Sequence, residues 1–300
     1  MKILIVGSAG QLARELQRSF AGFGEIIAAG RAEFNLADEA ETRDLVRRVA
    51  PQVLLNAAAY TAVDKAESEP ELAMAINGRA PGVLAEEARR LDALFVHYST
   101  DYVFDGSKQG PWIESDVTNP LNVYGATKLA GEQAVAQAGG RSLTFRTSWV
   151  YGPHGANFLL TMLRLARQRY ELSIVDDQFG APTTSMELAG ATFEIAKKIL
   201  AGECGTADKW SGVYHMSCSG ETTWRRFAEA IFARAAHLLD GKVPAVKAIP
   251  SSAYPTPARR PRNSVLSNQK LIDRFGVRLA PWESALERVI AELSRPAEEK

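Results

Sequence analysis

Three side chains have the types and the spacing of an acid-base device. Tyr124 and Lys128 stand four residues apart in the stretch YGATK, and on a helix this spacing brings both side chains to one face. A phenol with a pKa of about 10 exchanges protons poorly near neutral pH, but a neighbouring ammonium favours the phenolate and lowers that pKa. Thr100 ends an apolar run and supplies a second hydrogen-bonding group. The three residues predict proton donation to a carbonyl that is reduced by hydride.

A tyrosine and a lysine at this spacing also occur by chance on solvated helix faces. Two further features favour chemistry over that alternative. The segment from Ala93 to Tyr98 has the composition of a buried strand and delivers Ser99, Thr100 and Asp101 to its carboxyl end. A glycine turn near the N-terminus offers a place for the hydride carrier.

The glycine turn lies between residues 2–6, which have the pattern of a buried strand, and a helical pattern at 14–20. In GSAGQLA, Gly7, Gly10 and the small Ala13 let backbone amides at the helix start approach a pyrophosphate. The spacing is GxxGxxA instead of GxGxxG. A plain strand-to-helix turn is the alternative, but the position after the first strand favours a dinucleotide. The residues expected at the cofactor phosphates are Gly7, Gly10, Gln11 and Leu12.

The end of the second predicted strand, at 25–29, bears on the choice of cofactor. An NAD-selective site usually offers an acid to the adenosine ribose there, whereas this chain has Gly30-Arg31. An arginine favours the 2′-phosphate of NADPH, although a solvated loop cation is the alternative and use of NADH stays open. Small side chains after the third predicted strand leave room for a flat cofactor. The other residues expected around the cofactor are Asn35, Asp38, Ala57, Ala58 and Ala59.

The predicted elements alternate between strand and helix from residue 2 to residue 150. This order is typical of the α/β class with a doubly wound parallel sheet, the Rossmann arrangement, which binds its ligand across the carboxyl ends of the strands. Glycine and proline near 151 mark the passage to a smaller C-terminal α/β lobe. We expect an NAD(P)-binding domain at 1–151, to which some later segments return. A mainly substrate-binding lobe is expected at 152–300, with a frayed tail from Arg295 to Lys300.

Composition excludes several classes of function. Lys plus Arg and Asp plus Glu both number 35, so the formal net charge is zero, and no basic run indicates a nucleic-acid or membrane partner. No stretch reaches about 18 uncharged apolar residues, and the apolar start is too short for a signal peptide, so cytoplasm is the expected location. Cys204 and Cys218 lack metal-site spacing and are expected to be reduced thiols.

Several stretches together resemble a known family. The glycine turn, NAAA at 56–59, HYSTDYVF at 97–104 and YGATK are similar to the extended short-chain dehydrogenase/reductase superfamily. Within it, the dTDP-4-dehydrorhamnose reductases are resembled by AVDKAE at 62–67, FRTSWVY at 145–151, QFGAPT at 178–183 and YPTPARRP at 254–261. The resemblance covers nearly the whole chain. One departure is Ala13, where glycine is more usual.

The resemblance implies an NAD(P)H-dependent oxidoreductase that reduces the C4 ketone of dTDP-4-dehydro-β-L-rhamnose to dTDP-L-rhamnose, the last step of dTDP-rhamnose synthesis for polysaccharides. It makes Tyr124 the proton donor, Lys128 the residue that tunes it and holds the nicotinamide ribose, and Thr100 the residue that orients the carbonyl. The alternative for Trp149 is a core aromatic. The alternative for Arg259 and Arg260 is a pair of solvated cations, although the pyrophosphate of the substrate needs cationic partners. The residues implied around the sugar nucleotide are Thr100, Asp101, Tyr102, Trp149, Asn157, Arg259 and Arg260.

The relatives further imply a homodimer with Mg²⁺ held between its subunits. The glutamates that correspond to such a site are Glu15, Glu187 and Glu292. Each lies on a predicted helix, where a solvated surface charge is the alternative.

Other members of the superfamily remain as alternatives. A nucleotide-sugar 4,6-dehydratase would follow Thr100 with Asp-Glu, because elimination of water needs a carboxylic acid and base, but here Asp101 is followed by Tyr102. An epimerase keeps its cofactor bound, which a sequence does not display. A non-catalytic relative serves as the regulatory subunit of methionine adenosyltransferase. The intact Thr100, Tyr124 and Lys128 argue against that purely binding role.

Overall fold

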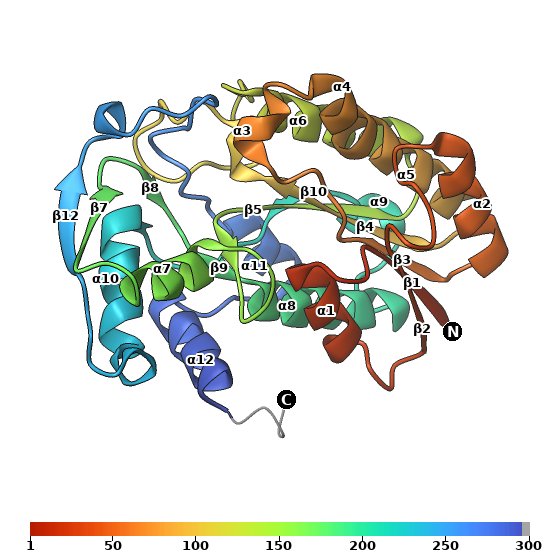
Figure 1. Ribbon diagram of the computed structural model, residues 1–300. Coiled ribbons are helices and arrows are strands. Elements are labelled where there is room, and N and C mark those ends of the chain that lie inside the picture. Colours follow the sequence, from red (N-terminus) through yellow and green to blue (C-terminus); the bar gives the residue numbers. More distant parts are fainter. Residues whose placement is uncertain (296–300) are drawn as a thin grey trace.

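A six-stranded parallel sheet forms the centre of the computed structural model, which describes residues 1–295 (Figure 1). The frayed tail was expected from Arg295 to Lys300, and all of it except Arg295 lies outside the described residues. The strand order is β10-β5-β4-β3-β1-β2, so the chain winds outward from β1 in both directions. The predicted doubly wound α/β class is confirmed, and β10 joins the sheet from the second half of the chain. The strands are β1 (Lys2–Val6), β2 (Glu25–Ala29), β3 (Val53–Asn56), β4 (Leu94–Thr100), β5 (Ser142–Thr147) and β10 (Gly212–His215).

Helices cover both faces of this sheet (Figure 1). Because side chains alternate along a strand, Ile3 and Ile5 pack against one layer of helices and Leu4 and Val6 against the other. All four are fully buried, as expected for a parallel sheet with two covered faces. One layer holds α1 (Gln11–Ser19), α8 (Ser185–Leu200) and α11 (Gln269–Phe275), and the other holds α2 (Glu39–Val49), α5 (Ala80–Arg90) and α6 (Val123–Ala138).

The continuous helical stretch from Pro70 to Arg90 is divided into three segments. α4 (Pro70–Ala73) continues into the π-helical η1 (Met74–Arg79) and then into α5. Pro81 stands in the first turn of α5, where its missing N–H is tolerated. In η1 the buried Asn77 amide donates to the Tyr60 carbonyl at 3.0 Å and accepts from the Tyr60 N–H at 2.8 Å. The wide turn therefore fixes the loop that follows β3.

A second lobe lies beside the sheet, at the left in Figure 1. Its core is a separate apolar cluster that includes Phe227, Trp282 and Leu286. The half-exposed β12 in this lobe was not predicted, since its apolar alternation is weak. The lobe contains α7 (Phe158–Ala166), α10 (Trp224–Arg234), α12 (Trp282–Ser294), β7 (Glu171–Val175), β8 (Phe179–Gly180), β11 (Thr222–Thr223) and β12 (Ala245–Ile249).

Short elements connect these parts of the chain. They are α3 (Val63–Ala66), η2 (Asp101–Val103), β6 (Val150–Tyr151), β9 (Thr183–Thr184), α9 (Ala207–Trp210), η3 (Ala236–Leu239) and η4 (Ser251–Ala253). Within residues 1–295, no helix combines the length and the apolar composition that a bilayer crossing requires.

Two contacts fix α6 on the sheet and against its neighbour. The buried Arg146 of β5 forms a bidentate ion pair with the buried Glu132 of α6, with N–O distances of 2.9 and 2.7 Å. On another side, Gly131 lets α6 approach η1, because a Cβ at this position would lie 2.1 Å from the Asn77 carbonyl oxygen. The helix that carries Tyr124 and Lys128 is therefore held in place from two directions.

We expect Gly131→Ala to destabilise the protein. The added methyl must displace the backbone of η1, and overpacking of this kind costs about 1–3 kcal/mol, which exceeds the gain of about 1 kcal/mol in helix propensity. The matched control is Gly190→Ala in α8, where an added Cβ would meet no atom within 4 Å. Urea unfolding should show a lower free energy of unfolding for Gly131→Ala and an equal or higher one for Gly190→Ala. Equal stability of the two variants would contradict the close-approach account.

Candidate active site

Lys128 is almost completely withdrawn from water, with 2% of its surface exposed. Its Nζ donates to the carbonyl oxygen of Tyr98 at 2.5 Å and lies 3.5 Å from Nε2 of His97. Burial lowers the pKa of Lys128 to about 8, and the charge of Glu132, one turn further along α6, opposes this shift. The end of β4 thus holds an ammonium that is still mostly charged at neutral pH.

His97 and Asn56 extend this polar chain into the sheet. Nδ1 of His97 lies 3.1 Å from the Asn56 amide nitrogen, and both side chains are buried. Burial, assisted by the charge of Lys128, holds the pKa of His97 well below its usual value. The ring is therefore neutral and accepts a hydrogen bond at one nitrogen only. Asn56 also accepts from the Ala58 N–H at 3.3 Å, so these buried polar side chains lie between Lys128 and the loop predicted to hold the cofactor.

Tyr124 stands one turn before Lys128 at the start of α6, which is capped by the Asn122 side chain. Burial raises the pKa of Tyr124 to about 12, the charge of Asp101 adds to the increase, and a hydrogen bond with Thr100 opposes it. The sequence predicted the opposite direction, a pKa lowered by Lys128. That prediction is wrong for this structure, because desolvation and Asp101 outweigh any effect of the ammonium. The phenol is held protonated, which is the form that donates.

Thr100 ends β4 and lies between Tyr124 and Asp101. Its hydroxyl donates to Oδ1 of Asp101 at 2.8 Å and accepts from the Tyr102 N–H at 3.2 Å. Burial raises the pKa of Asp101 to about 6, and hydrogen bonds from Ser264 and Thr100 oppose the shift. Thr100, Tyr124 and Lys128, predicted from sequence as one group, are thus brought together where β4 meets α6.

Aromatic side chains border the same region. The ring of Tyr102 meets that of Tyr124 edge-on, with centroids 5.8 Å apart. Trp149 adopts a left-handed backbone with φ of 47°, which is strained for a bulky residue, and its indole stacks on Trp224 at 3.6 Å. The same indole covers Gly180 so closely that a Cβ there would lie 2.5 Å from it. Trp149 is therefore a fixed platform in place of a mobile surface ring.

The predicted phosphate loop has the form that a dinucleotide requires. Gly7 has φ of 100°, and a Cβ on it would lie 3.2 Å from the Ala58 amide nitrogen, so only glycine fits between the two loops. At the start of α1, Gly10 provides no side-chain cap and the first turn holds no acidic residue. The N–H groups there remain available to an anion, and the residues present fit a pyrophosphate.

The residues expected near the adenosine lie at the end of β2. Arg31 is exposed, and among residues 1–295 no hydrogen bond or ion pair to its side chain is found. Asn35 accepts from the Ala37 N–H at 3.1 Å, and Asp38 caps α2 through the N–H groups of Ala40 and Glu41. Their roles toward a cofactor stay predictions.

Two residues expected at the nucleotide end are engaged elsewhere. Both guanidinium nitrogens of Arg260 contact the Asp64 carboxylate, at 2.7 and 3.0 Å. Asn157 caps α7, and its amide lies 3.3 Å from Gln11 at the phosphate loop. Arg259 is exposed at the surface. In this structure Arg260 thus clamps its loop to α3, and the predicted nucleotide contacts of Asn157, Arg259 and Arg260 stay predictions.

The three glutamates that the resemblance implies for a metal form ion pairs with two different arginines. Glu15 and Glu292 both contact Arg18, at 3.5 and 3.2 Å, and burial raises the pKa of Glu15. Glu187 instead pairs with Arg288 at 2.6 Å. Within the described part of the chain, no group of three His, Cys, Asp or Glu residues is placed to bind a metal ion. Magnesium between subunits, and the homodimer itself, stay predictions.

The sequence did not single out four residues that the structure places at this site. They are Asn56, His97, Asp64 and Trp224. Asp64 lies in AVDKAE and Arg260 in YPTPARRP, two stretches nearly 200 positions apart that meet as an ion pair. A pairing between residues so far apart in sequence cannot be predicted from local periodicity. The opposite charges of Asp64 and Arg260, each within a stretch that resembles the family, could have suggested it.

The fold and the arrangement of Thr100, Tyr124 and Lys128 define an extended short-chain dehydrogenase/reductase. Solved structures share the fold. A dTDP-4-dehydrorhamnose reductase of Clostridium acetobutylicum superimposes with a TM-score of 0.87 at 36% identity, covering 98% of this chain and 100% of that one. The enzyme of that name from Bacillus anthracis, solved in complex with NADP, gives 0.87 at 32% identity, covering 97% and 99%. A Thermus thermophilus UDP-glucose 4-epimerase, 19% identical with a TM-score of 0.77, shares the fold alone.

Sequence comparison narrows the class. The family described as RmlD substrate binding domain matches residues 1–295. A dTDP-4-dehydrorhamnose reductase of Burkholderia thailandensis is 49% identical over 98% of this chain and 99% of its own length. The Escherichia coli enzyme is 43% identical, with 98% of each chain covered. The chain therefore belongs to the dTDP-4-dehydrorhamnose reductase family, and the predicted resemblance is confirmed.

We expect Tyr124→Phe to lose turnover while keeping NADPH. Removal of one oxygen deletes the proton donor, and general acid catalysis contributes about 10²–10⁴-fold, so kcat should fall at least 100-fold. The ring that packs against Tyr102 remains, so the NADPH dissociation constant, followed by cofactor fluorescence, should change little. A rate within about threefold of the unmodified enzyme would refute the assignment of the proton donor.

Proposed function

We propose that the chain reduces the C4 ketone of dTDP-4-dehydro-β-L-rhamnose with NADPH and forms dTDP-L-rhamnose, the last step of dTDP-rhamnose synthesis. The observation that carries the proposal is the placement of Tyr124, hydrogen-bonded to Thr100, one helical turn from the buried ammonium of Lys128. Membership of the reductase family supports the choice of sugar nucleotide. Asp101 followed by Tyr102 supports reduction over dehydration.

The side chains of this site handle the proton of the reaction. NADPH, when bound, supplies the hydride to C4. Tyr124, protonated because its pKa is raised to about 12, donates to the sugar oxygen as negative charge develops there. The hydroxyl of Thr100 donates a hydrogen bond to Asp101 and also hydrogen-bonds with Tyr124, and these contacts fix the direction of the phenol. The ammonium of Lys128 favours the phenolate that remains.

The proposal is tested by the natural reaction. Purified protein, NADPH and dTDP-4-dehydro-β-L-rhamnose are mixed, and absorbance of the reduced cofactor is followed. We expect oxidation of one NADPH per sugar reduced and formation of dTDP-L-rhamnose, identified by mass spectrometry. No oxidation with authentic substrate would overturn the proposed function and favour a purely binding role for the same fold.

The same assay addresses the cofactor. Arg31 supports NADPH as the preferred donor, with NADH as a second one, because its free guanidinium follows β2 where the adenosine ribose is expected. In Arg31→Ala, loss of one charge-assisted contact should raise the KM for NADPH about tenfold and leave the KM for NADH nearly unchanged. An unchanged preference between the two cofactors would remove Arg31 from the site.

A further inference from the structure

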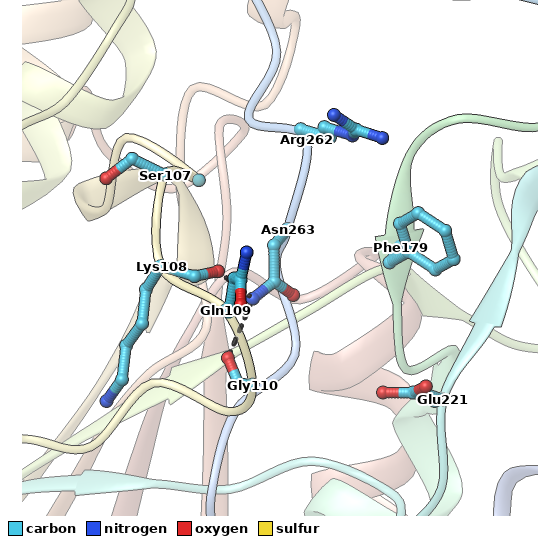
Figure 2. Close-up of a pocket in the computed structure, with 9 residues that line it drawn as sticks. Ser107, Lys108, Gln109, Gly110, Phe179, Glu221, Arg262 and Asn263 are labelled. Atoms are coloured by element: carbon cyan, nitrogen blue, oxygen red, sulfur yellow. Dashed lines mark hydrogen bonds between the residues drawn. The ribbon is translucent and has the colours of Figure 1, made fainter.

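The ammonium of Lys128 is enclosed by protein groups and does not line an open pocket. The pocket in Figure 2, of about 390 Å³, is lined by the loop at 106–110 and by residues that include Phe179 and Arg262, and neither Lys128 nor His97 is among them. His97 has none of its surface exposed. The groups that touch the ammonium therefore belong to the protein itself, and their hydrogen bonds influence its ionisation.

The hydrogen bonds of Asn56 fix which nitrogen of the His97 ring carries a hydrogen. The side-chain oxygen of Asn56 accepts from the Ala58 N–H at 3.3 Å, so its amide nitrogen is the atom that lies 3.1 Å from Nδ1 of His97. An amide nitrogen only donates, so Nδ1 accepts. The ring is neutral because burial holds the pKa of His97 well below its usual value. Its single hydrogen is therefore on Nε2.

Nε2 of His97 faces Nζ of Lys128 at 3.5 Å. A charged lysine has three N–H groups and no lone pair, so two donors face each other while the ammonium is present. The separation is longer than the roughly 2.9–3.0 Å of an ordinary hydrogen bond, whereas Nζ lies 2.5 Å from the Tyr98 carbonyl, which accepts. An uncharged amine has a lone pair that accepts from Nε2–H. The imidazole thus favours loss of the lysine proton.

The other titratable groups near Lys128 act in the opposite direction or are neutral. Glu132 of α6 raises the pKa of Lys128 and is paired with Arg146 of β5. Tyr124 of α6 is a protonated phenol, and Asp101 follows the end of β4. A negative charge on either residue would favour the ammonium. The imidazole is thus a neutral group beside Nζ that disfavours the charge.

We propose that His97 is a positioning residue that sets the upper pH limit of the reduction: Asn56 directs its Nε2–H group at Lys128, and this N–H favours the uncharged lysine. The consequence for turnover rests on the proposed function, in which the ammonium supports the phenolate of Tyr124. Charged lysine is the active form, so turnover falls as the pH rises through the pKa of Lys128, about 8. Without the Nε2–H group, the lysine would keep its proton to a higher pH.

The tautomer of His97 is tested by NMR of the unmodified protein labelled with ¹⁵N-histidine. The shifts of the ring nitrogens distinguish a nitrogen that carries a hydrogen from one that does not, and His97 should carry its hydrogen on Nε2. His215 is an internal reference with the opposite tautomer, because its Nδ1 lies 3.1 Å from the Trp112 carbonyl, which only accepts. A hydrogen on Nδ1 of His97, or a charged ring at neutral pH, would overturn the inference.

The resonances are assigned by their absence in His97→Gln and His215→Gln. If His97→Gln does not fold, elimination assigns its ring. The chain has four histidines, of which only His97 and His215 are buried. A soluble paramagnetic agent broadens the resonances of the accessible His154 and His237. The tautomer is therefore measured whether or not the variant is stable.

The effect on catalysis is tested by the pH dependence of kcat. The side-chain oxygen of glutamine can accept from the ammonium, so His97→Gln should move the alkaline limb upward by at least about one pH unit, as expected for a hydrogen bond to a charged group. The control is His215→Gln, the same replacement at a buried histidine of β10, which should leave the limb near pH 8. A purely structural role of His97 would lower the rate and leave the limb in place. An unmoved limb, or one moved to lower pH, would refute the proposal.

Failure of this inference is distinguishable from failure of the proposed function. If the unmodified enzyme reduces the 4-keto sugar nucleotide but His97→Gln keeps the alkaline limb, the function stands and the role of His97 falls. If His97 shows the Nε2–H tautomer but no reduction occurs, the arrangement of Asn56 and His97 stands and the function falls.

Discussion

Burial of the Lys128 ammonium is the constraint on which the site depends. A pKa of about 8 in place of 10.5 corresponds to a free-energy cost of about 3 kcal/mol for keeping the charge out of water. For a lysine with a lowered pKa, that cost is fully present below pH 8 and disappears as the pH rises through 10.5. It is tolerated because the Tyr98 carbonyl, the neutral His97 ring and the nearby Glu132 surround the ammonium.

The rest of the fold keeps α6 where this burial requires it. The close approach at Gly131 and the ion pair between Glu132 and Arg146 leave the helix little freedom to rise from the sheet. Position along the helix then places Tyr124 one turn before Lys128, and the end of β4 places Thr100 beside it. The second lobe adds the platform of Trp149 and Trp224. The groups that handle the proton thus come from α6 and the end of β4, while the aromatic platform comes from segments far apart in sequence.

The sequence revealed the parts of the site that depend on local pattern. Tyr124 and Lys128 share a helix face and Thr100 ends a strand, so periodicity was enough to group them. His97, Trp224 and the pairing of Asp64 with Arg260 depend on contacts between distant segments, which periodicity does not encode. The pKa of Tyr124 was predicted in the wrong direction because burial and Asp101 are properties of the packed site. The π-helical turn was missed for the same reason, since Asn77 bonds to a loop outside its helix.

The most direct test of this account is the titration of the Lys128 ammonium itself. Protein labelled with ¹⁵N-lysine gives an Nζ resonance that is assigned by its absence in Lys128→Met. Followed from pH 6 to pH 11, that resonance should titrate with a pKa of about 8, well below the exposed lysines. A value near the ordinary 10.5 would show that the ammonium is solvated and would contradict the account.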